Sequence, residues 1–234
     1  MKPILIVLFL ITTFGFSQKQ YDFDYLMECE MNIYKDSVDN ENHSIRVKDT
    51  TIRKYYLTNS KNNNYIAIVQ DSDSLSYKMT FKDEKGVISD VKISKSDLKS
   101  AEFINFECKH VNRYWNYFKN KKKHYGFFNL SDTIINGERY SRYKLQSTNP
   151  KRAKRKKLGT LYFIIDKETS FHLPILDHPL GYATWKYNRN LPKGMFFEKY
   201  FIDHQGKLHS RERVLNYWKI DKKFVIGEDC GYTK

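Results

Sequence analysis

The chain has 234 residues, and its 41 Lys and Arg against 27 Asp and Glu give a formal net charge of +14. Aromatic side chains make up 16% of the residues, with 18 Tyr and 16 Phe. This composition excludes a disordered chain, suits aromatic-rich β-strands and favours acidic partners.

The first 17 residues have the pattern of a cleavable signal peptide. The apolar run Ile4–Ile11 is too short to span a bilayer as a helix, which takes about 20 residues. Gly15 and Ser17 are small residues at the positions that signal peptidase reads for a cut before Gln18. We therefore expect residues 1–17 to be removed, and the mature chain to be periplasmic or secreted.

The mature chain, 18–234, is predicted to form a single β-rich domain without a transmembrane span. Asn136-Gly137 is typical of a two-residue hairpin turn, because both of its positions need a positive φ. The segments 83–86 and 203–206 each close on a glycine and indicate two further hairpins. Residues 161–165 and 195–202 are apolar on both faces, which predicts covered strands and a mainly β or α+β fold.

Residues 98–118 fit two structures. Apolar residues recur there at steps of three or four, which predicts a helix uninterrupted by Gly or Pro. Ile104, Phe106 and Cys108 also alternate as they would on a strand. Both alternatives stay open at this point.

The three cysteines are Cys29, Cys108 and Cys230. Export to an oxidising compartment allows one disulfide and leaves one thiol, but the spacing does not select the pair. The alternative is that all three are small buried side chains. Cys29 lies too far from the apolar run to be the lipidated first residue of a lipoprotein.

A dense basic run follows the middle of the chain. It resembles a nuclear import signal, which export rules out, so we interpret it as an exposed loop between two strands. Such a loop can contact anionic lipid headgroups or an acidic glycan, and we do not expect nucleic acid as a partner. The candidate contact residues are Lys151, Arg152, Lys154, Arg155, Lys156 and Lys157.

Catalytic and metal-binding motifs are absent from the sequence. It has no Cys-x-x-Cys or His-Glu-x-x-His spacing, no nucleophile elbow and no phosphate-binding Gly-rich loop. A Cys108–His110 thiol nucleophile is a weak possibility. We therefore expect no enzyme activity, no cofactor and no metal. Two segments do hold residue types that bind metals: His172, Asp177 and His178 in one, and His204, His209 and Glu212 in the other.

Residues 159–169 read Gly-Thr-Leu-Tyr-Phe-Ile-Ile-Asp-Lys-Glu-Thr, and Leu173-Pro174 follows. This segment resembles the strand, turn and Leu-Pro of periplasmic lipoprotein carriers of the outer-membrane lipoprotein-sorting pathway. The resemblance implies a curved antiparallel sheet, or half-barrel, closed by one or two helices and holding acyl chains on its inner face. The basic run at 151–157 is not part of that pattern. The chain is also similar to exported flavobacterial proteins of unknown function.

These observations lead to two hypotheses of different kinds. The first is a non-catalytic periplasmic binding or carrier protein for a lipid, a lipidated protein or another apolar ligand. The alternative is an interaction module that recognises an acidic glycan or a protein partner through the basic run. A hydrolase is a weaker third possibility.

Overall fold

The structure is a computed structural model that describes residues 18–39, 41, 43–118, 120–227 and 230. The predicted signal peptide lies outside the described residues. The strands are β1 (Lys19–Val38), β2 (Ser44–Thr58), β3 (Tyr65–Asp71), β4 (Ser76–Asp83), β5 (Val87–Ser94), β6 (Phe103–Phe106), β7 (Val111–Arg113), β8 (Tyr125–Ile135), β9 (Glu138–Ser147), β10 (Thr160–Ile165), β11 (Phe196–Ile202) and β12 (Leu208–Ile226). The helices are α2 (Lys95–Ser100), α3 (Pro150–Arg155) and α4 (Pro179–Asn188), with short 3-10 turns at Cys108–His110, Lys122–His124 and Lys167–Thr169.

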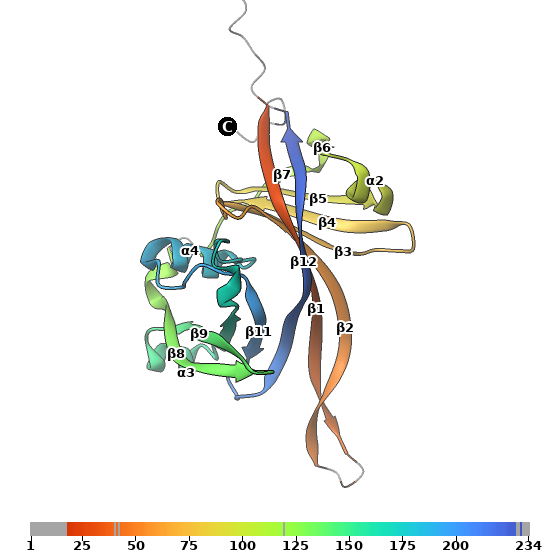
Figure 1. The fold of residues 1–234 in the computed structure, drawn as a ribbon. Coiled ribbons are helices and arrows are strands. Elements are labelled where there is room, and N and C mark those ends of the chain that lie inside the picture. The colour runs from red at the N-terminus through yellow and green to blue at the C-terminus, as the bar shows by residue number, and fades with distance from the viewer. Residues whose placement is uncertain (1–17, 40, 42, 119, 228–229, 231–234) are drawn as a thin grey trace, which may run out of the picture.

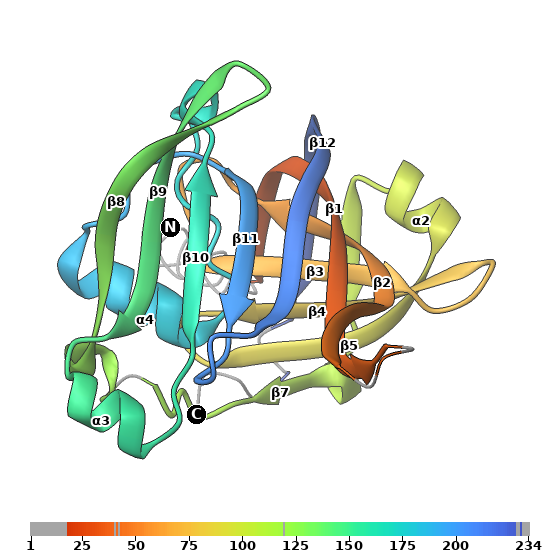
Figure 2. The same cartoon turned by 90° about the horizontal axis from the view of Figure 1, so that it is seen from below.

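All the strands belong to one 12-stranded sheet in the order β7-β5-β4-β3-β2-β1-β12-β11-β10-β9-β8, with β6 beside β12. Every pairing is antiparallel except that of β6 with β12. The long strands β1, β2 and β12 run through the molecule, and β8–β11 curve away from them on one side (Figures 1 and 2). The predicted curved antiparallel sheet is confirmed, and the described residues form three helices where one or two were predicted.

The three predicted hairpins are confirmed. Asn136 and Gly137 join β8 to β9 with φ values of 51° and 87°, as a turn with two positive φ angles requires. Gly86 and Gly206 also have positive φ and lie between β4 and β5 and between β11 and β12. These turns are decided by residues next to each other in the chain, so the sequence predicts them well.

The prediction of one long helix over residues 98–118 is wrong. Helix α2 ends at Ser100, and β6 then pairs in parallel with the end of β12. The strand alternative is confirmed for Ile104, which is half-buried, and Phe106, which is buried, but Cys108 lies in a 3-10 turn beyond the strand. A helix would also satisfy the backbone of this segment, so the burial of Phe106 in the core beside β12 is what favours the strand.

Two hydrophobic cores lie on opposite faces of the sheet. Successive residues of β2 belong to different cores, with Leu57 in one and Tyr56 in the other, and Ala67 and Ile66 on β3 do the same. This follows from the two-residue period of a strand. The second core lies on the inner face of the curve, where residues 170–195, including α4, cover the sheet. We call residues 170–195 the covering segment.

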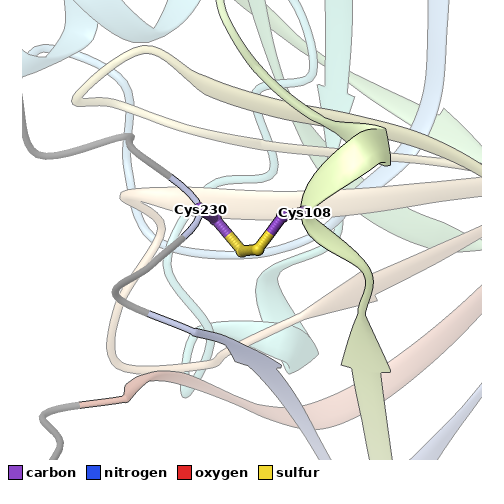
Figure 3. The surroundings of a disulfide bond; sticks show 2 residues. All are labelled: Cys108 and Cys230. Carbon is purple, nitrogen blue, oxygen red and sulfur yellow. A yellow bond between two sulfur atoms is a disulfide. The ribbon is translucent and has the colours of Figure 1, made fainter.

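The disulfide joins Cys108 to Cys230, with their Cα atoms 4.5 Å apart (Figure 3). It ties the turn after β6 to the residues that follow β12, two segments that the parallel pairing already brings together. Cys29 is a free, fully buried thiol on the inner face. The interpretation of Cys108 as a thiol nucleophile beside His110 is therefore wrong, because the Cys108 sulfur is bonded to the sulfur of Cys230.

Removing this crosslink should lower stability. The disulfide closes a loop of 122 residues, and loss of such a bridge from a secreted domain costs about 2–5 kcal/mol. We expect the double variant Cys108→Ser/Cys230→Ser to unfold at a lower urea concentration than the wild type. Dithiothreitol should lower the midpoint of the wild type and leave that of the variant unchanged. Equal midpoints for the reduced and oxidised wild type would contradict this pairing.

Candidate functional site

A cavity of about 270 Å³ lies between the inner face of the sheet and the start of α4. We call it the concave cavity. Side chains from five strands and one helix form its apolar wall: Met31, Tyr125, Leu145, Leu161, Leu180 and Phe201. Its polar lining is concentrated in Lys54, Asp177, His178, Lys199, Ser210 and Glu212. The cavity therefore has an apolar wall and a charged base.

Strand periodicity explains how the charged residues reach this face. Lys199 and Phe201 are two positions apart on β11, and Ser210 and Glu212 are two positions apart on β12, so each pair faces the cavity. The intervening Arg211 points the other way and pairs with Glu198. The sequence contains one signal of this, because the charged pair Glu198 and Lys199 interrupts a strand that is otherwise apolar or aromatic.

Five side chains at the base form what we call the buried charge cluster: Lys54, Tyr56, Asp177, Lys199 and Glu212. The Lys199 ammonium lies 2.9 Å from the Asp177 carboxylate and 3.3 Å from that of Glu212. The Tyr56 hydroxyl donates to Glu212 at 2.5 Å and lies 3.2 Å from Asp177. Lys199 also donates to the Tyr56 oxygen at 3.2 Å. Asp177, Lys199 and Glu212 thus each have partners of opposite charge and hydrogen-bond partners, as burial requires, and Lys54 lies 3.8 Å from Glu212.

These contacts set the protonation states. Burial by itself would raise the pKa of Asp177, but the Lys199 ammonium outweighs it and holds that pKa well below its ordinary value. Burial by itself would lower the pKa of Lys199, and the carboxylates of Asp177 and Glu212 raise it instead. Burial raises the pKa of Tyr56, and the same two carboxylates add to the effect. At neutral pH Asp177 and Lys199 are therefore charged and Tyr56 is neutral.

Two neighbours of the cluster have shifted pKa values for a simpler reason. Burial raises the pKa of the Cys29 thiol, so this side chain is a protonated, unreactive hydrophobe. Burial lowers the pKa of Lys82, whose ammonium donates to the backbone carbonyl of Asp177. That hydrogen bond is a second link between the sheet and the covering segment.

The candidate metal ligands are dispersed. His172 is buried 3.0 Å from the Thr58 hydroxyl, and His178 caps α4 by accepting from the Leu180 amide. Burial lowers the pKa of both histidines, so both are neutral at pH 7. Across the part of the chain that the structure describes, no three His, Cys, Asp or Glu side chains gather as a metal site. Asp177 and Glu212 do come together, but as partners of Lys199.

The basic run forms helix α3 as far as Arg155 and not the predicted loop; Lys156 caps the helix and Lys157 follows with a positive φ. Asn149 accepts a hydrogen bond from the Arg152 amide and Pro150 occupies the first turn, which together start α3. None of the six candidate contact residues pairs with an acidic side chain among the described residues. Arg152 instead lies over the ring of Tyr125, 5.1 Å from its centre, and Tyr125 lines the concave cavity. Helix α3 is therefore at the rim of the cavity.

No protein-family model matches the chain, and no curated protein sequence matches it either. Among solved structures, a putative outer membrane lipoprotein-sorting protein domain from Vibrio parahaemolyticus is 12% identical, with 84% of this chain and 85% of that chain covered and a TM-score of 0.30. A LolA superfamily protein from Nitrosomonas europaea is 10% identical, with 83% and 85% covered and a TM-score of 0.29. Lipoprotein-sorting proteins, which the sequence segment 159–174 resembles, are thus among the solved structures that the comparison finds, at this low level of similarity.

The MucA/MucB complex from Pseudomonas aeruginosa is 5% identical, with 83% of this chain and 52% of that chain covered and a TM-score of 0.36. The chain spans about half the length of the MucB structures that it matches. At TM-scores this low, the likenesses carry no argument about function.

No helix in the described ranges is long and apolar enough to cross a membrane.

Replacing Lys199 by an apolar side chain should destabilise the protein strongly. Lys199→Met leaves two buried carboxylates without their main partner, which costs about 3–5 kcal/mol. The exposed pair of Lys167 and Asp132 supplies the control, since Lys167→Met should cost less than about 1 kcal/mol. Urea unfolding at pH 7 measures both.

The deficit of Lys199→Met should shrink in acid. Asp177 has a lowered pKa in the folded protein, so its stabilising effect is present above its unfolded pKa of about 4 and is lost as pH falls further. In Lys199→Met the Asp177 carboxylate has lost this partner. Protonating Asp177 in acid therefore costs the variant less stability than it costs the wild type. A deficit that stays constant from pH 7 to pH 3 would show that the ion pairs do not cause it.

Proposed function

We propose that this protein is a non-catalytic periplasmic binding or carrier protein for a lipid or another apolar ligand. The observation that carries the proposal is the concave cavity, whose wall is built from apolar side chains of the sheet and α4. Ligand pockets typically combine such a wall with a few polar groups that fix orientation. The charged base and the apolar wall fit this description.

The size of the cavity favours a slim ligand. Its volume of about 270 Å³ lies at the small end of ligand pockets, which range over about 300–1,000 Å³. A single alkyl chain of moderate length fits this space, whereas a lipid with several acyl chains would extend beyond it. The basic helix α3 at the rim would then lie next to the part that extends out.

The groups at the base support binding better than catalysis. Lys199 and Tyr56 hold both carboxylates, and the thiol of Cys29 is protonated. A general base or nucleophile needs a pKa matched to its task and access to a reacting atom. These side chains instead act as a fixed polar floor.

A bulky side chain inside the concave cavity should weaken ligand binding. Leu161 lies on its wall, so Leu161→Trp places a large ring in the space that an alkyl chain would occupy. We expect the affinity for a fluorescent fatty acid to fall at least about tenfold, or about 1.4 kcal/mol. Ile134, which is 72% exposed at the end of β8, provides the control Ile134→Trp with unchanged affinity. A purified wild-type protein that takes up no fluorescent fatty acid would exclude the proposal.

A second candidate function rests on α3. Its basic side chains are not neutralised by described acidic residues, and Lys154, Arg155, Lys156 and Lys157 are exposed. A further basic residue lies nearby, since Lys121 is 3.4 Å from the ring centre of Tyr117, and Lys156 also acts electrostatically on Tyr117. We infer that this surface recognises the anionic groups of an acidic glycan or of lipid headgroups.

Neutralising α3 should weaken binding to a polyanion. The variant with Lys154, Arg155, Lys156 and Lys157 changed to Gln should elute from heparin resin at lower salt than the wild type, because fewer cations contact the polyanion. Four exposed lysines elsewhere, Lys48, Lys78, Lys85 and Lys99, changed to Gln make a control of equal net charge. If both variants elute together, only net charge matters and α3 is not a specific site.

A further inference from the structure

Lys54 and Lys199 line the base of the concave cavity together with Asp177 and Glu212, and a third lysine, Lys82, donates to the Asp177 backbone carbonyl. Lys54, Lys82 and Lys199 gather around two carboxylates, Asp177 and Glu212. Cys29 and His178 add no charge at neutral pH, because burial raises the pKa of the thiol and lowers that of the imidazole. Three lysines thus lie near two carboxylates, and a surplus of ammonium groups beside a partly buried cavity favours an anionic ligand.

Lys54 is the lysine of the cavity lining whose ammonium makes no hydrogen bond among the described residues. The Lys199 ammonium contacts two carboxylates and the Tyr56 oxygen, and Lys82 donates to a backbone carbonyl. The Lys54 ammonium has one ion-pair partner among the described residues, Glu212, at 3.8 Å, which is too long for a hydrogen bond. An ammonium group carries three donors. The Lys54 side chain is only 13% exposed and lines the cavity.

The apolar wall of the concave cavity extends from the Lys54 ammonium toward the rim beside α3. Leu145, Leu161 and Leu180 line the same space, and Tyr125 connects it to Arg152 of α3. A ligand with a negative group at one end and an alkyl chain at the other matches this layout. Its negative group would accept from Lys54 at the base, and its chain would lie along the leucines.

We propose that the concave cavity binds a monoanionic amphiphile, of the fatty carboxylate class, with its headgroup inserted first against Lys54. This inference rests on the proposed apolar-ligand function and adds the charge and the orientation of the ligand. The cavity selects against neutral and cationic amphiphiles of the same length, because the former leave the excess positive charge unpaired and the latter add to it.

Competition between three ligands of equal chain length tests the proposal. Decanoate, decanol and decylamine are titrated against a bound fluorescent fatty alcohol at pH 7.5, with the wild type, Lys54→Met and Lys48→Met. Methionine keeps most of the length of lysine and removes its charge. Lys48 is exposed on the same strand, β2, so Lys48→Met controls for net charge.

For the wild type and Lys48→Met, we expect decanoate to bind at least about tenfold more tightly than decanol, as a buried ion pair provides. Decylamine should bind more weakly than decanol. Lys54→Met should bind decanoate and decanol about equally, with its affinity for decanol unchanged. The wild-type order of affinities tests the proposal even if Lys54→Met fails to fold.

Equal wild-type affinities for decanoate and decanol would overturn this inference and leave the apolar-ligand function standing. A preference for decanoate that survives in Lys54→Met would also overturn it, because the anion would then be bound elsewhere. If none of the amphiphiles binds, the proposed function itself fails and the inference fails with it.

Discussion

The ammonium group of Lys199 is the contact on which the arrangement of the inner face depends. It reaches from β11 to Asp177 on the covering segment, to Glu212 on β12 and to Tyr56 on β2. Apolar contacts alone would let the covering segment shift along the sheet, whereas hydrogen-bonded ion pairs form only at short distance, here at Lys199 and also between Lys186 and Glu84. By holding Asp177 in place, Lys199 fixes the start of α4 beside the concave cavity. The same buried charges that position the covering segment also supply the polar base of the cavity.

Much of the fold could be predicted from the sequence because it depends on neighbouring residues. Gly137 and Gly206 mark turns through their positive φ, and alternation predicts strands such as β10. The cavity could not be predicted, since Lys54, Asp177, Lys199 and Glu212 lie on different elements and share no spacing. The charged pair Glu198 and Lys199 within an otherwise apolar or aromatic strand is the one local signal. It shows that a partner must exist but does not identify the partner.

Where the sequence allows two structures or predicts the wrong one, contacts between segments far apart in the chain often select the observed structure. Residues 98–118 contain both helical and strand periods, and the parallel pairing of β6 with β12 selects the strand for its middle part. The same pairing brings Cys108 beside Cys230 and so selects the disulfide. The basic run was expected to be a loop because charge repulsion disfavours regular structure. Asn149 and Pro150 start a helix there in spite of that repulsion.

The pairing of β1 with β12 has a consequence for the order of folding. These strands stand side by side at the centre of the sheet, yet almost the whole described chain separates them. When the chain emerges from a ribosome or a translocation channel with its N-terminus first, β1 and β2 can pair early, but the other edge of β1 stays open until β12 has emerged. That edge carries Met27 and Cys29, which are fully buried in the finished protein. During this interval the nascent chain presents an unpaired strand edge, which is the kind of surface that is prone to aggregation.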